Sequence, residues 1–334
     1  MGNLLESPIT TKDSHSLELN GLSVGISGMQ GWRTEMEDAH TAVALQSKPE
    51  HTLVGVFDGH GGQFAALYSA EHLSAVLERR PEWQEYVQGT GDDRPEKQVG
   101  DALTQAFLEL DEELRTKPEV ERSGCTAVAA VITPTFIMVA NAGDSRCVLG
   151  TQRLTKPMSE DHKPTLDSER ERIEAAGGTV SWKRVDGDLA VSRAIGDFGY
   201  KTRTDLPPER QKVTALPDIR VHMRSPKDEV LLLACDGVWD VMENEESLEL
   251  LRTLMSEGER DASRMCEEVL DQALEKGSRD NISACIVTLP GAAYGRGGGV
   301  MARREQRQRA KESEERRKEK DMMHAAGDGS KDQS

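Results

Sequence analysis

Two aspartates stand in this sequence where a buried strand should end. The apolar run at residues 53–57 is followed at once by Asp58, in "VFDGHGG", and the run "LLLAC" is followed by Asp236, in "LLLACDGVWD". A buried carboxylate without a partner costs free energy, so each of these side chains needs one. Because the same pattern occurs twice, we expect the two aspartates to meet a shared partner.

Further carboxylates follow apolar runs or stand beside glycines. They are Glu35, Glu37 and Asp38 in "RTEMEDAH", Asp144 in "NAGDSR", Asp240 in "GVWDVMEN" and Asp280 in "SRDNIS". Each has an ordinary structural explanation when it is taken alone. Asp144 and Asp280 suit turns, and Asp240 with Glu243 suits a capping box at a helix start.

Taken together, these carboxylates favour a site for hard cations. Oxygen ligands without clustered His or Cys suit Mg²⁺ or Mn²⁺. Two such ions about 3.5–4 Å apart can hold a water between them and lower its pKa, which makes a nucleophile without any protein nucleophile. Gly59, directly after Asp58, lets its backbone carbonyl approach an ion closely.

Arg33 and His60 are the candidates for handling a substrate. The Arg33 guanidinium has the shape to hold a phosphate, although a salt bridge to Glu35 or Glu37 would explain it equally well. His60 is fixed between glycines two residues after Asp58. A general acid in that place would protonate a serine or threonine leaving group, a contribution of about 10²–10⁴-fold.

Seven segments resemble, in order, the motifs of the protein phosphatase 2C family, the metal-dependent protein phosphatases. They are "RTEMEDAH", "VFDGHGG", "SGCTAVAAVI", "VANAGDSR", "LAVSRAIGD", "LLACDGVWD" and "SRDNIS", within about residues 22–290. The resemblance implies an α+β fold: a central β-sandwich of two antiparallel sheets flanked by helices, in α-β-β-α layers. It also implies an irregular flap near the active site.

The resemblance further implies a role for each site residue. Asp58 would bridge two Mn²⁺ or Mg²⁺ ions, the Gly59 carbonyl would bind one of them, Asp236 and Asp280 would bind the other, and Glu37 and Asp38 would act through metal-bound waters. Arg33 would hold the phosphate, and His60 would protonate the leaving group. Asp144 and Asp240 would form a weaker third metal site with Asp236. One residue departs from the family pattern: Cys125 stands where a serine is usual. We expect it to affect packing near Thr126 more than chemistry.

The implied activity is that of a protein serine/threonine phosphatase. A binuclear metal centre would activate a bridging water to attack the phosphorus of phosphoserine or phosphothreonine in a protein substrate. The alternative is a catalytically weak relative of the same fold that binds phosphoproteins. Its signature would be lost metal carboxylates, and every motif carboxylate is present. A metal-dependent nuclease is disfavoured by the acidity of the chain.

The elements around these residues agree with the fold that the resemblance implies. Strand-like runs from 21 to 57 and from 126 to 149 are separated by short turns, which indicates antiparallel hairpins and not strict βαβ alternation. Two helices are expected between them, one from about residue 62 and one over 99–114, joined by a loop at "QGTGDDRP". A further helix should begin with Asp167 as its N-cap. Residues 165–220 form the expected flap, and the folded domain spans 21–290.

Composition narrows the remaining function classes. The chain has 334 residues and a formal net charge of −17, which disfavours nucleic-acid binding. Its 5 cysteines form no CxxC pair and predict free thiols in a reducing compartment. No run of apolar residues reaches the length of a membrane span. We therefore expect a monomer in the cytoplasm or nucleus.

Both ends of the chain read as polar segments outside the core. Residues 1–20 are expected to form an irregular leader, and 291–334 a Gly-rich linker with a charged tail that is disordered or, as the alternative, a solvated helix. "MGNLLES" places Gly2 where N-myristoylation requires it, although Glu6 stands where Ser or Thr is preferred. A disordered, unmodified leader is the alternative. One acyl chain would give only weak, reversible membrane association.

Overall fold

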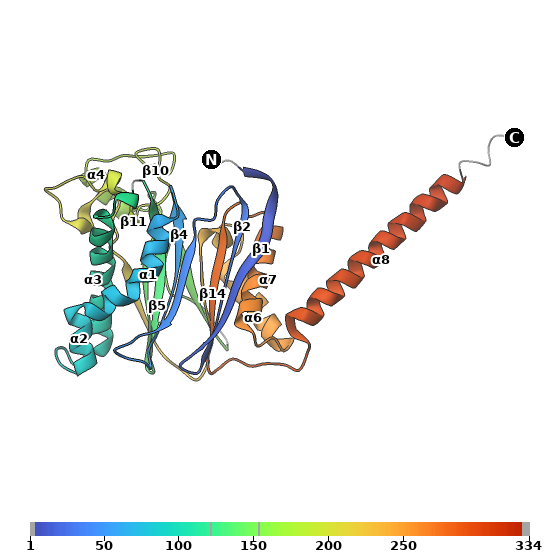
Figure 1. Cartoon of the computed structure of the whole chain (residues 1–334), viewed down its shortest axis with the longest axis horizontal. Helices are drawn as coiled ribbons and strands as arrows, with labels where there is room; N and C mark the ends of the chain where they lie inside the picture. The colour runs from blue at the N-terminus through green and yellow to red at the C-terminus, as the bar shows by residue number, and fades with distance from the viewer. Residues whose placement is uncertain (1–3, 121, 153, 329–334) are drawn as a thin grey trace.

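The computed structural model of the chain describes residues 4–120, 122–152 and 154–328. Two β-sheets stack face to face, and helices cover the outer face of each, which gives four layers (Figure 1). The strand pairings within these two sheets of the described chain are antiparallel. The predicted α+β sandwich is therefore confirmed.

The first sheet runs in the order β1-β2-β14-β13-β7-β8. Its strands are β1 (Leu4–Leu19), β2 (Leu22–Arg33), β14 (Ile282–Thr288), β13 (Asp228–Ala234), β7 (Arg146–Thr151) and β8 (Thr155–Pro157). The second sheet runs in the order β12-β6-β5-β4-β3, with β11 paired to β5. Its strands are β12 (Asp218–Met223), β6 (Phe136–Ala142), β5 (Gly124–Ile132), β4 (Thr52–His60), β3 (Ala39–Ala44) and β11 (Ile195–Gly196).

The helices fall into two groups, one for each sheet (Figure 1). The second sheet is covered by α1 (Phe64–Arg79), α2 (Pro81–Gln88) and α3 (Pro95–Arg115). The first sheet is covered by α5 (Asp236–Trp239), α6 (Asn244–Ser256) and α7 (Ala262–Glu275). Three short 3₁₀ turns also occur: η1 (Pro118–Val120), η2 (Phe198–Tyr200) and η3 (Pro208–Arg210).

Three apolar cores separate the four layers. The central strands have both faces buried, so their sequences are nearly continuous apolar runs. In β13, Leu231 and Leu233 point into the core between the two sheets, where they meet Val56 of β4. Val230 and Leu232 alternate with them and face the core under α6 and α7. The period of two along a strand thus divides one apolar run between two cores.

The N-terminal segment differs from its prediction. Residues 4–19, expected as part of an irregular leader, form the edge strand β1, in continuous register with β2 from Asp13 to Leu19. Its side chains are mostly exposed and polar, which is the composition of a protected sheet edge and gives no apolar signal. Backbone pairing and a few polar contacts, such as the ion pair of Lys12 with Asp271, hold this strand, so the sequence pattern could not reveal it.

Two helix predictions also need correction. The segment between the two predicted helices contains α2, which begins with Pro81 at its first turn and fully buries Trp83. Asp167 is the first residue of α4 (Asp167–Ala175), and Leu166 takes the N-cap place without a side-chain cap. Asp240 does not cap the start of α6, whose N-cap is Glu243; it is the C-cap residue of α5.

The flap is irregular, as expected, but it has a core of its own. It contains α4 and the two-stranded ribbon of β9 (Val180–Ser181) and β10 (Arg184–Val185). Glu169 of α4 is buried and accepts hydrogen bonds from Arg172, Ser192 and Arg193. These arginines hold the pKa of Glu169 at about 2, although its burial acts in the opposite direction. Figure 1 shows the flap above one end of the second sheet.

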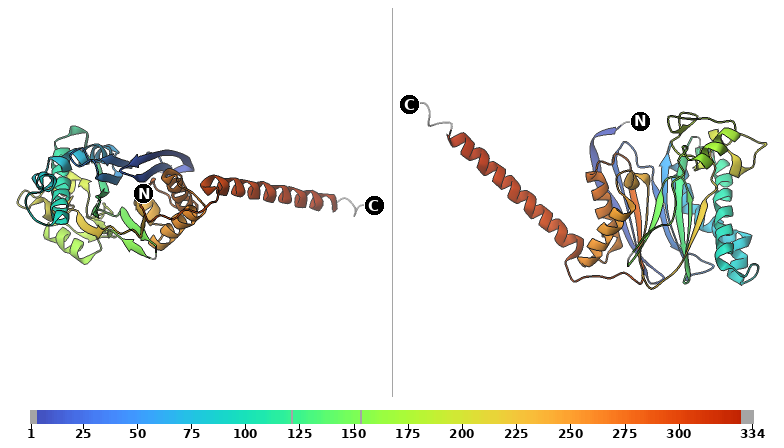
Figure 2. Two further views of the ribbon diagram at one scale, coloured as in Figure 1. Left: turned by 90° about the horizontal axis from the view of Figure 1, so that it is seen from below. Right: turned by 180° about the vertical axis from the view of Figure 1, so that it is seen from behind.

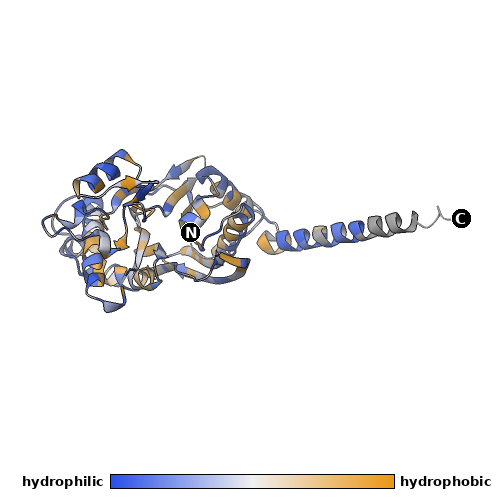
Figure 3. Cartoon of the chain, turned by 90° about the horizontal axis from the view of Figure 1, so that it is seen from above, coloured by the Kyte–Doolittle hydropathy of each residue, from blue (hydrophilic) through white to orange (hydrophobic). Residues whose placement is uncertain are grey.

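The chain ends in a long helix, α8 (Gly299–Asp328), where the sequence analysis expects disorder. The helix projects away from the sandwich in every view (Figure 2), and most of its residues are hydrophilic (Figure 3). Its first turns are fixed: Val300 is fully buried, and Arg304 and Arg307 pair with the buried Glu268 of α7. The sequence of this helix has no apolar stripe, so ion pairs help to anchor its first turns.

Among the described residues, none of the helices combines the length and hydropathy that crossing a membrane requires.

Candidate metal centre and active site

The carboxylates that end strands meet at one end of the sandwich. Antiparallel pairing explains this: Asp58 near the end of β4 lies opposite Thr126 near the start of β5, and Ala234 at the end of β13 lies opposite Ala284 near the start of β14. A cavity of about 280 Å³ opens there. It is lined by Arg33, Glu37, Asp58, Gly59, His60, Thr126, Asp144, Arg184, Leu189, Ala190, Val191, Asp236, Asp280 and Asn281.

Most of the predicted site residues therefore share one cavity, and the other two lie at its edge. Asp38 is buried behind it, where ligand atoms of Asp38, Asp58 and Cys235 all lie within 4.8 Å of one another. Asp240 lines a neighbouring cavity together with Arg33 and Asp280. Gly2 lies outside the described residues.

Asp38 is the clearest sign that something is meant to bind here. Both of its carboxylate oxygens are buried, and neither has a hydrogen-bond partner in the described part of the chain. Burial raises the pKa of Asp38 to about 7, and repulsion from Asp280 and Glu37 adds to this. A buried carboxylate is normally satisfied by a hydrogen bond, an opposite charge or a metal ion.

Asp58 and Asp236 line the adjoining cavity and are partly exposed to it. Burial raises the pKa of both well above its ordinary value, and the neighbouring carboxylates push it further up. Among the described residues no Lys, Arg or His forms an ion pair with either. The charge deficit of the cluster and its all-oxygen character fit divalent cations such as Mg²⁺ or Mn²⁺.

Arg33 has a different partner from the ones that its sequence neighbours suggest. Its Nη2 donates to Asp280 Oδ2 at 2.6 Å, across 247 residues, and not to Glu35 or Glu37. Its side chain is 38% exposed and borders the cavity, so the rest of the guanidinium is free to meet an anion. Both structural alternatives considered from the sequence are therefore wrong.

His60 is held by a residue that the sequence analysis did not single out. Its Nε2 lies 2.7 Å from Oδ2 of the buried Asp197. Burial alone would lower the pKa of His60, but the Asp197 carboxylate outweighs burial and raises it. Gly124 leaves room for the pair, because a Cβ there would lie 2.3 Å from Asp197 Oδ2 and 2.6 Å from His60 Nε2.

Asn281 positions the acidic stretch before β3. Its Nδ2 donates to the backbone carbonyls of Gln30 and Glu35, and its Oδ1 accepts from the Glu37 amide, each at 2.9 Å. Glu37 Oε1 in turn accepts from the amide of Gly62 at 2.5 Å. One side chain thus ties the loop carrying Glu37 to the start of β14.

Glycine is required where these segments cross. A Cβ at Gly59 would lie 2.2 Å from the Glu37 carbonyl oxygen, and one at Gly237 would lie 2.0 Å from the Asn281 carbonyl oxygen. The glycines beside Asp58 and Asp236 therefore let neighbouring backbone segments pack closely. The sequence suggests a different reason for Gly59, namely room for an ion at its carbonyl.

Asp144 forms a close ion pair with Lys163, which no sequence signal suggested. The charge of Asp144 raises the pKa of Lys163 despite its burial. Burial raises the pKa of Asp240, and Asp144 and Asp280 contribute to this. Asp144 and Asp240 thus belong to the same electrostatic cluster as Asp236.

The cysteines behave as predicted. All five are free and buried. Cys125 lies 3.6 Å from the Ser69 hydroxyl of α1, on the side away from the cavity, whereas Thr126 donates to or accepts from Ser145 at 2.7 Å. The departure from the family pattern at Cys125 therefore concerns packing between β5 and α1.

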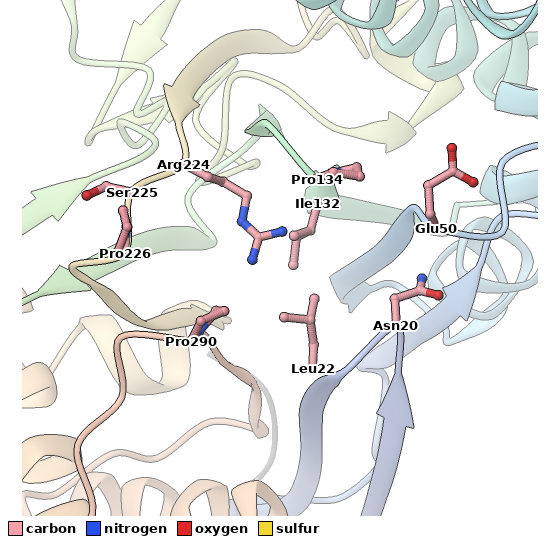
Figure 4. A pocket seen from close by; sticks show the side chains of 9 residues that line it. All are labelled: Asn20, Leu22, Glu50, Ile132, Pro134, Arg224, Ser225, Pro226 and Pro290. Carbon is pink, nitrogen blue, oxygen red and sulfur yellow. The ribbon is translucent and has the colours of Figure 1, made fainter.

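The opposite end of the sandwich has no comparable group of residues. A cavity of about 600 Å³ lies there, lined by Asn20, Leu22, Glu50, Ile132, Pro134, Arg224, Ser225, Pro226 and Pro290 (Figure 4). Its charged side chains are one arginine, which donates to the Thr133 carbonyl at 2.7 Å, and one glutamate. Every predicted site residue that the structure describes lies at the other end.

Comparisons with known proteins agree with this geometry. The family model described as "Protein phosphatase 2C" matches residues 22–282. Protein phosphatase 1A of Homo sapiens is 42% identical over 299 residues, which cover 87% of this chain and 77% of that protein. Protein phosphatase 2C homolog 2 of Hypocrea jecorina is 40% identical over 306 residues, which cover 86% of this chain and 67% of that protein.

Solved structures show the same fold. A phosphatase from a pathogenic strain of Toxoplasma gondii superposes with a TM-score of 0.72 at 27% identity, covering 84% of this chain and 96% of that one. A serine-threonine phosphatase 2C from Toxoplasma gondii gives a TM-score of 0.69 at 25% identity, covering 85% of this chain and 98% of that one.

Proposed function

Because the chain belongs to the protein phosphatase 2C family, whose members are metal-dependent protein serine/threonine phosphatases, we propose that the carboxylate cluster is its catalytic centre. One observation carries the proposal: Asp38, whose carboxylate oxygens are buried without a partner, lies in one carboxylate cluster with Asp58 and Asp236, and none of the three forms an ion pair among the described residues. Bound divalent ions would supply the missing positive charge and a water of lowered pKa as the nucleophile.

The cluster offers ligands for two Mn²⁺ or Mg²⁺ ions. Asp58 would bridge them, the Gly59 carbonyl would bind one, Asp236 and Asp280 would bind the other, and Glu37 and Asp38 would act through metal-bound waters. Asp144 and Asp240 would contribute with Asp236 to a weaker third site. The pairing of Asp144 with Lys163 fits a weaker site, because the lysine competes with a cation there.

Arg33 would bind the phosphate. Asp280 holds one nitrogen of its guanidinium and so fixes the direction in which the other donors point. Those donors match two phosphate oxygens, which an ammonium group would not do. The substrate phosphate is thereby held between Arg33 and the cluster.

His60 would give a proton to the leaving oxygen of serine or threonine. Asp197 orients the ring through Nε2 and stabilises its protonated form, which leaves Nδ1 for the substrate. An alkoxide is a poor leaving group, so this proton transfer contributes most to phosphoserine and phosphothreonine and least to aryl phosphates.

We further propose that the enzyme acts as a monomer on phosphoproteins of the cytoplasm or nucleus. Gly2 is proposed to be acylated, which would add a weak, reversible membrane association. Intact-mass spectrometry of the protein from its native cells decides that point, and an unmodified Gly2 removes the idea.

The test of the catalytic proposal is hydrolysis of phosphothreonine peptides with and without Mn²⁺ or Mg²⁺. We expect turnover that needs the ion and is lost in excess chelator. Peptide binding without turnover in Mn²⁺ would favour the non-catalytic relative, and cleavage of single-stranded DNA would favour a nuclease.

His60→Ala then tests the assigned proton donor on two substrates. Its loss of kcat should be about 10²–10⁴-fold on phosphopeptides and much smaller on p-nitrophenyl phosphate. Equal losses on both substrates would remove His60 from the general-acid role.

A further inference from the structure

A second cavity adjoins the active site on the far side of His60. It has a volume of about 490 Å³ and shares His60 and Leu189 with the active-site cavity. The flap supplies two parts of its wall, one with Asp188 and Leu189 and one with Phe198 and Tyr200 of η2. The imidazole of His60 therefore stands at the boundary between the two cavities.

The position of His60 fixes the direction in which a peptide substrate must lie, if the proposed function holds. A proton donor has to reach the leaving oxygen to within about 2.6–3.2 Å. That oxygen belongs to the serine or threonine side chain, so the phosphorylated residue of the substrate must lie next to His60, and the rest of the peptide extends from there. The phosphate occupies the carboxylate side of this imidazole, and the second cavity is the space on the other side.

One part of the wall of this cavity is suited to apolar groups, and another carries the exposed Arg122. Tyr200 donates its hydroxyl to Asp188 Oδ2 at 3.0 Å, and Asp197 is engaged by His60, so these polar groups already have partners. The guanidinium of Arg115 covers the Phe198 ring at 4.3 Å from its centre, which fixes the ring in place. Leu189, Phe198 and Tyr200 thus present a preformed apolar surface.

The backbone of the η2 wall is strained. Asp197 has φ of +54°, and Gly196 before it has φ of +85°. A non-glycine residue in this conformation is strained and is found most often at functional sites. Here the strain places Asp197 against His60 and starts the turn that carries Phe198 and Tyr200 into the cavity.

We infer that this cavity is the substrate subsite that selects an apolar side chain next to the phosphorylated residue. The inference rests on the proposed function, because it depends on His60 acting at the leaving oxygen. It adds Tyr200, Phe198 and Leu189 as residues that determine specificity and leave the chemical step unchanged. A Leu, Met or Phe beside the phosphoresidue would bury its surface there, whereas Gly would not.

The test compares phosphothreonine peptides that carry Leu, Phe, Gly or Asp on each side of the phosphoresidue, with p-nitrophenyl phosphate as a substrate too small to reach the subsite. The wild type should favour Leu or Phe over Gly by about tenfold in kcat/KM on one flank. Tyr200→Ala should reduce this preference to about twofold or less, through KM, and leave p-nitrophenyl phosphate turnover unchanged.

Tyr294→Ala is the matched control, because Tyr294 is also half-buried but lies outside both cavities. It should keep the wild-type preference. A wild type indifferent to both flanks, with normal turnover of p-nitrophenyl phosphate, overturns the inference and leaves the proposed function standing. A preference that survives Tyr200→Ala also overturns it. Failure to hydrolyse either substrate in Mn²⁺ overturns the proposed function and the inference together.

Discussion

The metal-free protein should lose stability as the pH rises, and Asp38 gives the effect a size. Its pKa is raised from 3.8 to about 7 by burial and by the neighbouring carboxylates. A carboxyl that is harder to ionise in the folded state penalises folding once the solution pH ionises it. Its penalty is therefore absent below about pH 4, grows from there, and is complete above about pH 7.

The difference between the two pKa values is roughly 3 units, and each unit is worth about 1.4 kcal/mol. Ionising Asp38 thus costs about 4 kcal/mol in full, of which about 2 kcal/mol appears between pH 5.5 and pH 8. Asn has the same shape and no charge, so Asp38→Asn removes this dependence. A buried amide without partners also costs about 1–3 kcal/mol at every pH, so the slope with pH is the diagnostic quantity.

Urea denaturation in excess chelator measures this slope. Between pH 5.5 and pH 8, the free energy of unfolding should fall by about 2 kcal/mol more in the wild type than in Asp38→Asn. Glu71→Gln, an exposed change in α1, is the matched control and should follow the wild type. Equal slopes for the wild type and Asp38→Asn would refute the view that Asp38 is an uncompensated buried carboxyl.

Three other outcomes follow from the geometry. Asp197→Asn should lower the pKa of His60, so the alkaline limb of the kcat profile for phosphopeptides should move to lower pH; an unmoved limb would contradict the pairing. Glu169→Gln should destabilise the protein by about 3 kcal/mol at neutral pH, a difference that calorimetry should find shrinking as the pH falls from 4.5 towards 2. Deleting residues 310–334 should change neither turnover nor melting temperature. Deleting residues 291–334 should keep peptide turnover and lower the melting temperature. A large loss of turnover would mean that the tail serves the active site.

Much of the sandwich could be predicted because its central strands are buried on both faces. Such strands read as short apolar runs, and the turns between them carry Gly, Asp and Asn. Asp58 and Asp236 were visible for the same reason, since a charge directly after a buried run is unusual. Their meeting in one cavity depends on the stacking of the two sheets, which brings the ends of β4 and β13 to the same end of the sandwich.

The residues that sequence reasoning missed act through partners far along the chain. Asp197 belongs to the quoted motif "LAVSRAIGD", yet its partner His60 is 137 residues away. Asn281 and Lys163 likewise act on residues that only the fold brings near. The one available signal for Asp197 was its position directly after a glycine at the end of this motif, because a strained turn often supports a functional side chain.

Segments held by backbone pairing or by ion pairs were also beyond prediction. The edge strand β1 needs no apolar pattern, since hydrogen bonds to β2 hold it. The start of α8 is anchored by Arg304 and Arg307 on Glu268, and charged residues at helical spacing do not distinguish a docked helix from a solvated one. In both segments, long-range contacts decide the structure.

The central claim is that the buried carboxylates form a metal centre that hydrolyses phosphoproteins. Its most direct test measures Mn²⁺ binding by calorimetry and phosphothreonine-peptide turnover on the same samples of wild type and Asp236→Asn. The wild type should bind Mn²⁺ and lose turnover in excess chelator, and Asp236→Asn should remain folded, bind Mn²⁺ more weakly and lose turnover. Full wild-type turnover in excess chelator, or full turnover by Asp236→Asn, would contradict the account.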